Sequence, residues 1–209
     1  MSAFTDKVEA QCRVELKRFK NGKGRENIDP FSGFVGEYWK IGVKNPNING
    51  KTTFQGKKGP FRPAWSSAFV SFIMRTAGAG TAFFYHEAHI HYVVKAIRDA
   101  KTPGTMAKFL GRDPETFAPK VGDIINAGRA ESKNVTFKDV LAKYGKKPVP
   151  DGNFMSSHSD IVVSVDGKTL TTVGGNVEVD TVGEKTWKLN AAGTLVKGPS
   201  LICVIECLL

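Results

Sequence analysis

Pro63-Ala64-Trp65-Ser66-Ser67-Ala68-Phe69-Val70-Ser71-Phe72 is the stretch that decides the fold of this chain. The preceding Arg62-Pro63 step favours an extended approach, because a residue before proline is disfavoured in the helical region. Apolar residues then recur at helical spacing as far as Gly78, which predicts a buried helix with a serine in its first turn. Ser66 or Ser67 is expected to accept hydrogen bonds from the free amides there.

A second informative stretch lies in the C-terminal half. Ser157-His158-Ser159-Asp160 opens an apolar run that continues to Val165, which predicts a strand with one histidine at its mouth. A following strand ends in Gly174-Gly175-Asn176, and Asp166-Gly167 between the two is typical of a tight hairpin turn. The hairpin joins the histidine strand to the Asn176 strand.

A nucleophile at a helix N-terminus, a histidine on one strand and a polar residue on the next is the order found in papain-like amidases of the NlpC and CHAP types. The chain resembles them. Bacterial members often have Trp-Cys-Ala-Ala-Phe-Val-Ser-Trp in the helix and Gly-His-Val-Gly-Ile-Val-Val in the strand. Residues 65–72 and 157–163 align with these segments without gaps, and Ser66 stands at the cysteine position.

The chain is more similar still to a bacterial branch described as a domain of unknown function, in which serine is the usual residue at this position. Three further segments carry this resemblance, and their counterparts here are Ala88-His89-Ile90-His91-Tyr92, Pro119–Ile124 and Ser157–Val163. The resemblance covers about residues 30–209. It implies an α+β fold of the papain-like NlpC/CHAP type, with N-terminal helices packed on a C-terminal antiparallel sheet. We expect one domain over residues 1–209, in which 1–30 form a helical extension.

The resemblance also implies roles for single residues. Ser66 would be the nucleophile, His158 the general base and Asn176 the residue that orients the histidine, with Asp160 as a less favoured substitute. A serine hydroxyl is too weak an acid to be held as an anion by a helix N-terminus, so a true base is required. The residues expected to line the cleft are Trp65, Ser67, His89, Ser157 and Asp160.

We therefore expect a hydrolase of amide bonds in peptidoglycan peptides that needs no cofactor. The backbone amides of Ser66 and Ser67 would stabilise the oxyanion, and a shift of one residue would make Ser67 the exposed hydroxyl. One alternative is a catalytically silent module that binds cell-wall fragments or a protein partner. Another is an acyltransferase or lipid hydrolase on the same scaffold, since a fold does not determine its chemistry. The plainest alternative makes Ser66 a helix cap and His158 an ordinary strand residue.

The segment His86-Glu87-Ala88-His89-Ile90-His91 suggests a metal site at first sight. The helical zinc motif needs histidines four residues apart, but Ile90 occupies the position four after His86. His86 and His89 could share a helix face as a metal pair. The family pattern instead favours His89 as a cleft residue, and we predict no metal.

Composition and charge limit the classes of molecule that the protein is expected to bind. The 209 residues are 41% hydrophobic and carry a formal charge of +10, and residues 1–62 hold 13 Lys and Arg against 6 Asp and Glu. This surplus suits an anionic partner such as peptidoglycan or another cell-wall polymer. Nucleic acid is disfavoured, because the basic residues are scattered and no recognised motif accompanies them.

The N-terminus and the cysteines bear on where the protein acts. No apolar run reaches the roughly 20 residues that span a bilayer, and no basic segment followed by an apolar one marks a Sec signal peptide. We expect synthesis in the cytoplasm, followed by export on a non-Sec route or release on lysis. Such a protein would suit an antibacterial effector or a phage-related lytic protein with an immunity or secretion partner. Cys12, Cys203 and Cys207 are expected in the core.

The remaining patterns predict the other elements. Helices are expected over residues 4–19, from Asp29-Pro30 to Trp39, 83–100, 105–110 and 137–144, a loop over 43–62, and strands over 121–126, 160–165, 168–173, 176–182, 185–189 and 200–207. Asp123 at the first of these strands is expected to accept hydrogen bonds from backbone amides.

Overall fold

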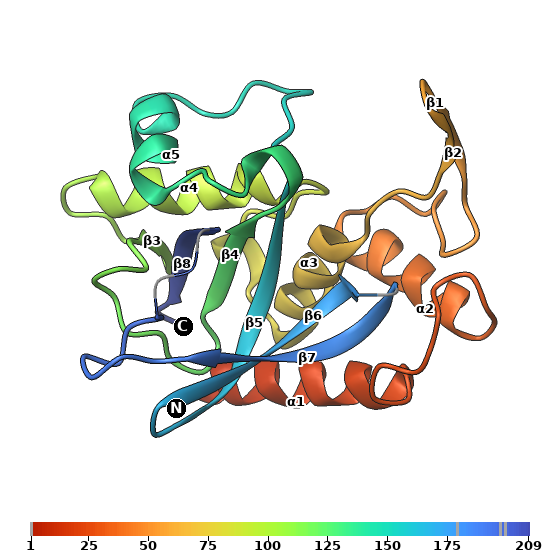
Figure 1. The fold of residues 1–209 in the computed structure, drawn as a ribbon, viewed down its shortest axis with the longest axis horizontal. Helices are drawn as coiled ribbons and strands as arrows, with labels where there is room; N and C mark the ends of the chain where they lie inside the picture. Colours follow the sequence, from red (N-terminus) through yellow and green to blue (C-terminus); the bar gives the residue numbers. More distant parts are fainter. Residues whose placement is uncertain (1, 179, 197, 199) are drawn as a thin grey trace.

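Six antiparallel strands in the order β3-β8-β4-β5-β6-β7 form the main sheet of this α+β protein, and helices pack against it (Figure 1). The computed structural model describes residues 2–178, 180–196, 198 and 200–209. The helices are α1 (Ala3–Arg18), α2 (Phe31–Glu37), α3 (Ser66–Ala77), α4 (His89–Lys101) and α5 (Phe137–Tyr144). The strands are β1 (Phe54–Gly56), β2 (Gly59–Phe61), β3 (Phe109–Arg112), β4 (Ile124–Gly128), β5 (Ser157–Asp166), β6 (Thr169–Val177), β7 (Thr181–Lys188) and β8 (Leu201–Cys207).

The helices with strong local signals form where the sequence predicts them. A capping box between Ser2 and Thr5 starts α1, whose apolar stripe of Val8, Cys12 and Leu16 is buried against the rest of the core. A second capping box starts α5, which spans the predicted residues 137–144. In both cases side-chain oxygens satisfy amides that the helix itself leaves free.

Helix α3 is held firmly at its first turn. Trp65 precedes it, is completely buried, and donates from Nε1 to Glu26 Oε2 at 2.5 Å. A side chain at Gly175 would place its Cβ 2.6 Å from both the Trp65 ring and Phe69. Glycine therefore lets β6 approach α3 closely. The helix ends at Gly78, which has the left-handed φ of +97° that glycine tolerates.

Before β4, three predicted elements differ from the structure. The helix expected from residue 83 begins only at His89, because Ala88 is extended. Residues 109–112 form strand β3 instead of the end of a helix, since they pair with β8. The expected loop over 43–62 contains the hairpin β1–β2, which projects from the body of the protein (Figure 1). In each case pairing or packing outside the segment decides its conformation.

The predicted hairpin turn at Asp166-Gly167 is confirmed, and it joins β5 to β6. The single strand expected over 176–182 is not formed. Asn176, Glu178 and Asp180 all have left-handed backbones, and the chain turns there from β6 into β7. Left-handed residues interrupt a ladder because their amides leave the plane of the sheet.

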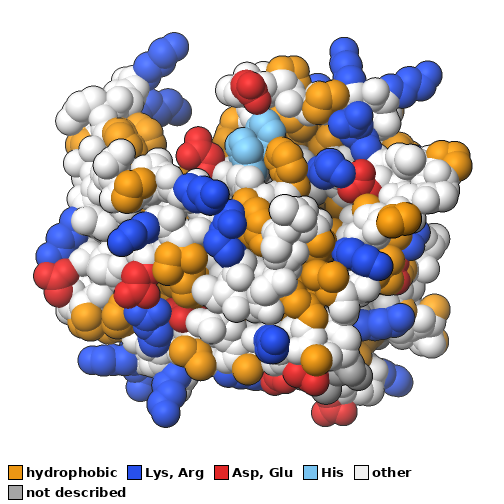
Figure 2. All heavy atoms as spheres, turned by 180° about the vertical axis from the view of Figure 1, so that it is seen from behind, with side chains coloured by type: hydrophobic (Ala, Val, Ile, Leu, Met, Phe, Trp, Pro, Cys, Tyr) orange, Lys and Arg blue, Asp and Glu red, His pale blue; other side chains and the backbone are white. Residues whose placement is uncertain are grey.

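The helices and the surface charge can be compared with the expectations for membrane spans and binding partners. No helix in the described part of the protein is both long and apolar enough to span a membrane. Lys and Arg side chains are scattered over the face seen from behind instead of forming one cluster (Figure 2).

Cys12 and Cys203 are buried, as expected, whereas Cys207 is only partly buried. Burial raises the pKa of the Cys12 and Cys203 thiols. Both therefore stay protonated.

Asp123 is buried and accepts hydrogen bonds from the backbone of Lys120 and of Cys207, each at 2.8 Å. The predicted structural role of this carboxylate is confirmed. It ties the segment before β4 to the end of β8. Burial raises its pKa from 3.8 to about 7, although the two amides favour the charged form.

The raised pKa predicts a pH-dependent stability. Between about pH 4 and 7 the unfolded chain loses the Asp123 proton while the folded protein keeps it, so the free energy of unfolding falls as pH rises. The slope from this group approaches about 1.4 kcal/mol per pH unit. An Asp123→Asn variant cannot titrate, so its stability relative to wild type should increase from pH 4.5 to 7.5 in urea unfolding. A difference that does not change with pH would contradict the assignment.

Candidate active site

Ser66 is the first residue of α3 and is 5% exposed. Its hydroxyl does not cap the helix, since no side-chain cap is formed at this end. Instead Ser66 Oγ and His89 Nε2 share a hydrogen bond of 2.7 Å. The predicted partner of Ser66 was His158, so the structure puts a different histidine in direct contact with the hydroxyl.

His89 begins α4, and its other ring nitrogen, Nδ1, is hydrogen-bonded to the hydroxyl of Tyr92. The two residues are three apart on one helix, so their side chains meet on the same face. Burial, together with His158 and Arg129, lowers the pKa of His89 well below its ordinary value. Burial also raises the pKa of Tyr92. Near pH 7 the contact therefore joins a neutral imidazole to a neutral phenol.

His158 forms a second buried pair. Its Nε2 lies 2.7 Å from Asp160 Oδ1, and both side chains lie on one face of β5 because the two residues are two positions apart in the strand. The His158 Nδ1 is buried and has no hydrogen-bond partner among the described residues. The rings of His158 and His89 lie 5.8 Å apart between centroids, at an angle of 67°. Ser66 and the two histidines are thus linked in one cluster.

Asp160 is held as a carboxylate. Burial works to raise its pKa, but the charge and the hydrogen bond of His158, then Lys185 and Arg129, lower it overall. Gly174 on the neighbouring strand makes room for the pair, since a Cβ there would lie 1.9 Å from Asp160 Oδ1 and 3.1 Å from His158 Nε2. The histidine and its carboxylate therefore depend on a glycine across the sheet.

Asn126 supports the start of β5 from the adjacent strand. Its side-chain amide donates to the His158 carbonyl at 3.1 Å and to Ser159 Oγ at 2.9 Å. Ser157, expected in the cleft, lies 3.4 Å from the same amide. These contacts hold the backbone of the histidine in place without touching its ring.

The prediction that Asn176 orients His158 is wrong. With its side-chain amide turned so that both atoms are paired, Asn176 accepts the Trp65 N–H at 3.1 Å and donates to Asp180 at 3.3 Å. A bulge between Gly175 and Val177 and a left-handed φ of 57° at Asn176 accompany this arrangement. Asn176 thus anchors the start of α3, and Asp160, the substitute thought less favourable, holds the histidine.

The remaining predicted cleft residues have structural contacts. Trp65 is completely buried in the core, so it lines no open cleft. Ser67 Oγ donates to the His86 carbonyl at 2.7 Å. The hydroxyl of Ser67 is therefore committed to a neighbouring loop and is less suited than Ser66 to attack a substrate.

The two histidines of the suggested metal pair do not share a helix face. His86 lies before α4, accepts the Ala88 N–H at Nδ1 at 2.9 Å, and stacks on His91 at 3.7 Å between ring centroids. No group of three or more His, Cys, Asp or Glu side chains in the described part of the chain is arranged to hold a metal ion.

A cavity of about 670 Å³ lies beside His158 and Asp160. His158, Asp160, Arg129 and Lys185 are among the residues that line it, whereas Ser66 is not. Tyr92, Arg129 and Lys185 also belong to this site, although none of them is predicted from the sequence. The spacing of Tyr92 from His89 was a signal that could have been used, but Arg129 and Lys185 join the site only through the pairing of strands.

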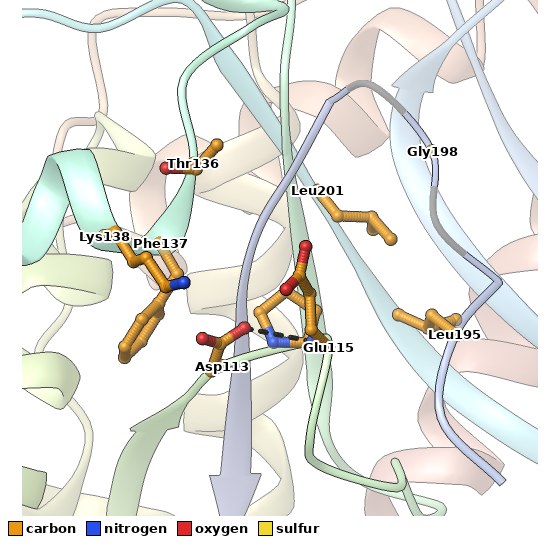
Figure 3. A pocket seen from close by; sticks show the side chains of 9 residues that line it. Asp113, Glu115, Thr136, Phe137, Lys138, Leu195, Gly198 and Leu201 are labelled. Atoms are coloured by element: carbon orange, nitrogen blue, oxygen red, sulfur yellow. Dashed lines mark hydrogen bonds between the residues drawn. The ribbon is translucent and has the colours of Figure 1, made fainter. Parts of the chain in front are cut away.

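A separate cavity of about 280 Å³ lies between the start of α5 and the segment before β8. Figure 3 shows Phe137 and Lys138 on one side, with Leu195 and Leu201 across from them, and a hydrogen bond of 3.0 Å from the Glu115 backbone to Asp113. Its lining contains none of the predicted site residues. The cavity beside His158 is therefore the better candidate for substrate.

A family model described as "Uncharacterized protein conserved in bacteria (DUF2272)" matches residues 32–205. No curated protein and no solved structure matches the chain. The matched range includes the whole cluster from Ser66 to Asp160.

Proposed function

The chain belongs to the bacterial DUF2272 family, and we propose that it is a serine hydrolase with a papain-like fold of the NlpC/CHAP type that cleaves amide bonds in peptidoglycan peptides. Ser66 would be the nucleophile, His158 the general base and Asp160 the residue that orients it. The observation that carries this proposal is the buried His158–Asp160 pair. The second ring nitrogen of His158 is unpartnered among the described residues, and its ring lies 5.8 Å between centroids from the ring of His89, to which Ser66 is bonded.

The base must become an imidazolium during the attack, and this requirement favours His158 over His89. A carboxylate on the opposite ring nitrogen stabilises the positive charge of His158. His89 has only a neutral phenol there, and its surroundings already lower its pKa. The hydroxyl of Ser66 must therefore leave His89 before it can react.

The reaction would follow the usual course of acyl transfer. Ser66 Oγ bonds to the substrate carbonyl carbon as its proton passes to His158. The C–N bond then breaks, and His158 returns the proton to the leaving amine. Water hydrolyses the ester in the same way. The backbone amides of Ser66 and Ser67, at the positive end of the helix dipole of α3, would stabilise the oxyanion.

The positive charge of the protein suits this substrate, because peptidoglycan and the polymers attached to it are polyanions. The formal charge is +10. The scatter of Lys and Arg over the face shown in Figure 2 supports adsorption to an extended polymer better than recognition of one charged group.

The test is release of amines from purified cell wall together with labelling by a fluorophosphonate. We expect wild type to release amines and to be labelled at Ser66, and Ser66→Ala to do neither. Ser67→Ala is the matched control, since it removes the neighbouring hydroxyl and should keep both properties. Amine release by Ser66→Ala equal to that of wild type would refute the proposal.

A silent module that only binds wall fragments is the second candidate. Three observations on Ser66 favour this second candidate. Ser66 is buried, its hydroxyl is hydrogen-bonded to His89, and it does not line the cavity beside His158. A Ser66→Cys variant separates the two, because a thiol needs less help from a base. Amine release by the cysteine variant but not by wild type would indicate a silent site.

A further inference from the structure

Among the described residues, the cavity beside His158 and Asp160 is lined by two basic side chains, Arg129 and Lys185. Arg129 follows β4 directly, and Lys185 lies in β7. In the sheet order β4-β5-β6-β7, β4 is next to the strand that bears His158 and Asp160, and β7 lies beyond β6 on its other side (Figure 1). Both cations act on Asp160, since each lowers its pKa.

Most negative charges of the lining are already paired within the protein. Asp160 is bonded to His158, and Glu184 is bonded to Arg13 at 2.5 Å. The guanidinium of Arg129 has no hydrogen bond or ion pair with any described residue, although the Arg129 backbone is hydrogen-bonded to Ser156 and Ser132. The Lys185 ammonium lies 3.6 Å from the centre of the Trp187 ring, which positions the charge without neutralising it. Among the described residues of the lining, Glu178 is the one other carboxylate.

We propose that Arg129 and Lys185 bind a free carboxylate of the substrate, so that the enzyme acts on peptides bearing a carboxylate close to the scissile amide. This inference rests on the proposed function and narrows its substrate class. A guanidinium offers two parallel N–H donors that match a carboxylate, and a partly desolvated cleft strengthens such a bond. The scissile carbonyl would then lie toward His158 and Ser66.

The experiment measures binding separately from hydrolysis. In a Ser66→Ala background, short peptides of peptidoglycan composition are titrated as the free carboxylate and as the matched carboxamide, by calorimetry. We expect the carboxylate to bind about tenfold more tightly or better, as for hydrogen bonds between charged groups. Adding Arg129→Met should abolish this preference, and Lys185→Met should reduce it. Because both side chains are exposed, neither change should unfold the protein.

Two controls use the same strand and the same cavity. Lys188→Met removes an exposed charge of β7 outside the lining, and should leave the preference unchanged. Glu178→Gln removes the other carboxylate of the lining and should tighten binding of the carboxylate peptide. Equal affinity for carboxylate and carboxamide, absence of binding, or a preference that survives both methionine substitutions would overturn the inference.

Failure of the proposed carboxylate site can be distinguished from failure of the proposed hydrolase function. A carboxylate preference that depends on Arg129, in a protein whose wild type releases no amines, would retain the binding site and reject the hydrolase. Amine release without any such preference would retain the hydrolase and reject this site.

Discussion

A His158→Gln variant is expected to lose about a thousandfold in kcat/KM for amide hydrolysis, whereas His89→Gln should lose about tenfold. Glutamine fills a similar volume but cannot take a proton, and loss of a general base costs about a hundred- to ten-thousandfold. His158 has the carboxylate that stabilises an imidazolium. His89 contacts the hydroxyl as a neutral ring in buried surroundings, so its loss should chiefly disturb the position of Ser66.

The measurement is the initial rate of release of amines at several substrate concentrations, with thermal unfolding as the check on folding. The same two variants are then tested for fluorophosphonate labelling, which requires an activated hydroxyl. A loss in His89→Gln equal to or greater than that in His158→Gln would make His89 the base, and would assign the observed contact with Ser66 a direct catalytic role.

The second large effect is expected from Gly174→Ala, which adds a single carbon. The new Cβ would lie 1.9 Å from Asp160 Oδ1, so the carboxylate must move away from His158 or the strands must separate. We expect kcat/KM to fall by about a hundredfold or more, because a base without its orienting carboxylate holds the wrong tautomer and position. Gly33→Ala is the matched control, since its added carbon meets nothing within 4 Å.

Gly174→Ala could also lower activity by destabilising the fold. Asp160→Asn is therefore a second variant that tests the same pair of His158 and Asp160. It removes the charge of the carboxylate without adding volume, and should lower kcat/KM by a similar factor. Unchanged kinetics in both variants would show that the pair of His158 and Asp160 has no part in the reaction.

The elements that sequence could predict are those whose signals are local. A regular apolar stripe and a capping box specify α1, and a capping box specifies α5. The Asp166-Gly167 step specifies the turn between β5 and β6. These signals act over three or four residues, so a single sequence contains them in full.

The elements that sequence missed depend on distant partners. Residues 109–112 become β3 because β8 pairs with them from the other end of the chain. The six residues before His89 carry the same apolar spacing as α4, yet Phe83 packs against Tyr92 and Phe109 outside a helix. A helical pattern says which face is apolar, but it does not say whether a stronger partner exists elsewhere.

The sequence by itself determined the kinds of residue at the candidate site and the elements that carry them, namely Ser66 at a helix start and the pair of His158 and Asp160 on a strand. Only the tertiary structure decided which side chains meet. It joined Ser66 to His89, gave the orienting contact to Asp160, and turned Asn176 toward Trp65. The physical reason is that such bonds depend on differences of one residue in strand register and on the space left by Gly174, which arise only when the sheet and α3 pack together.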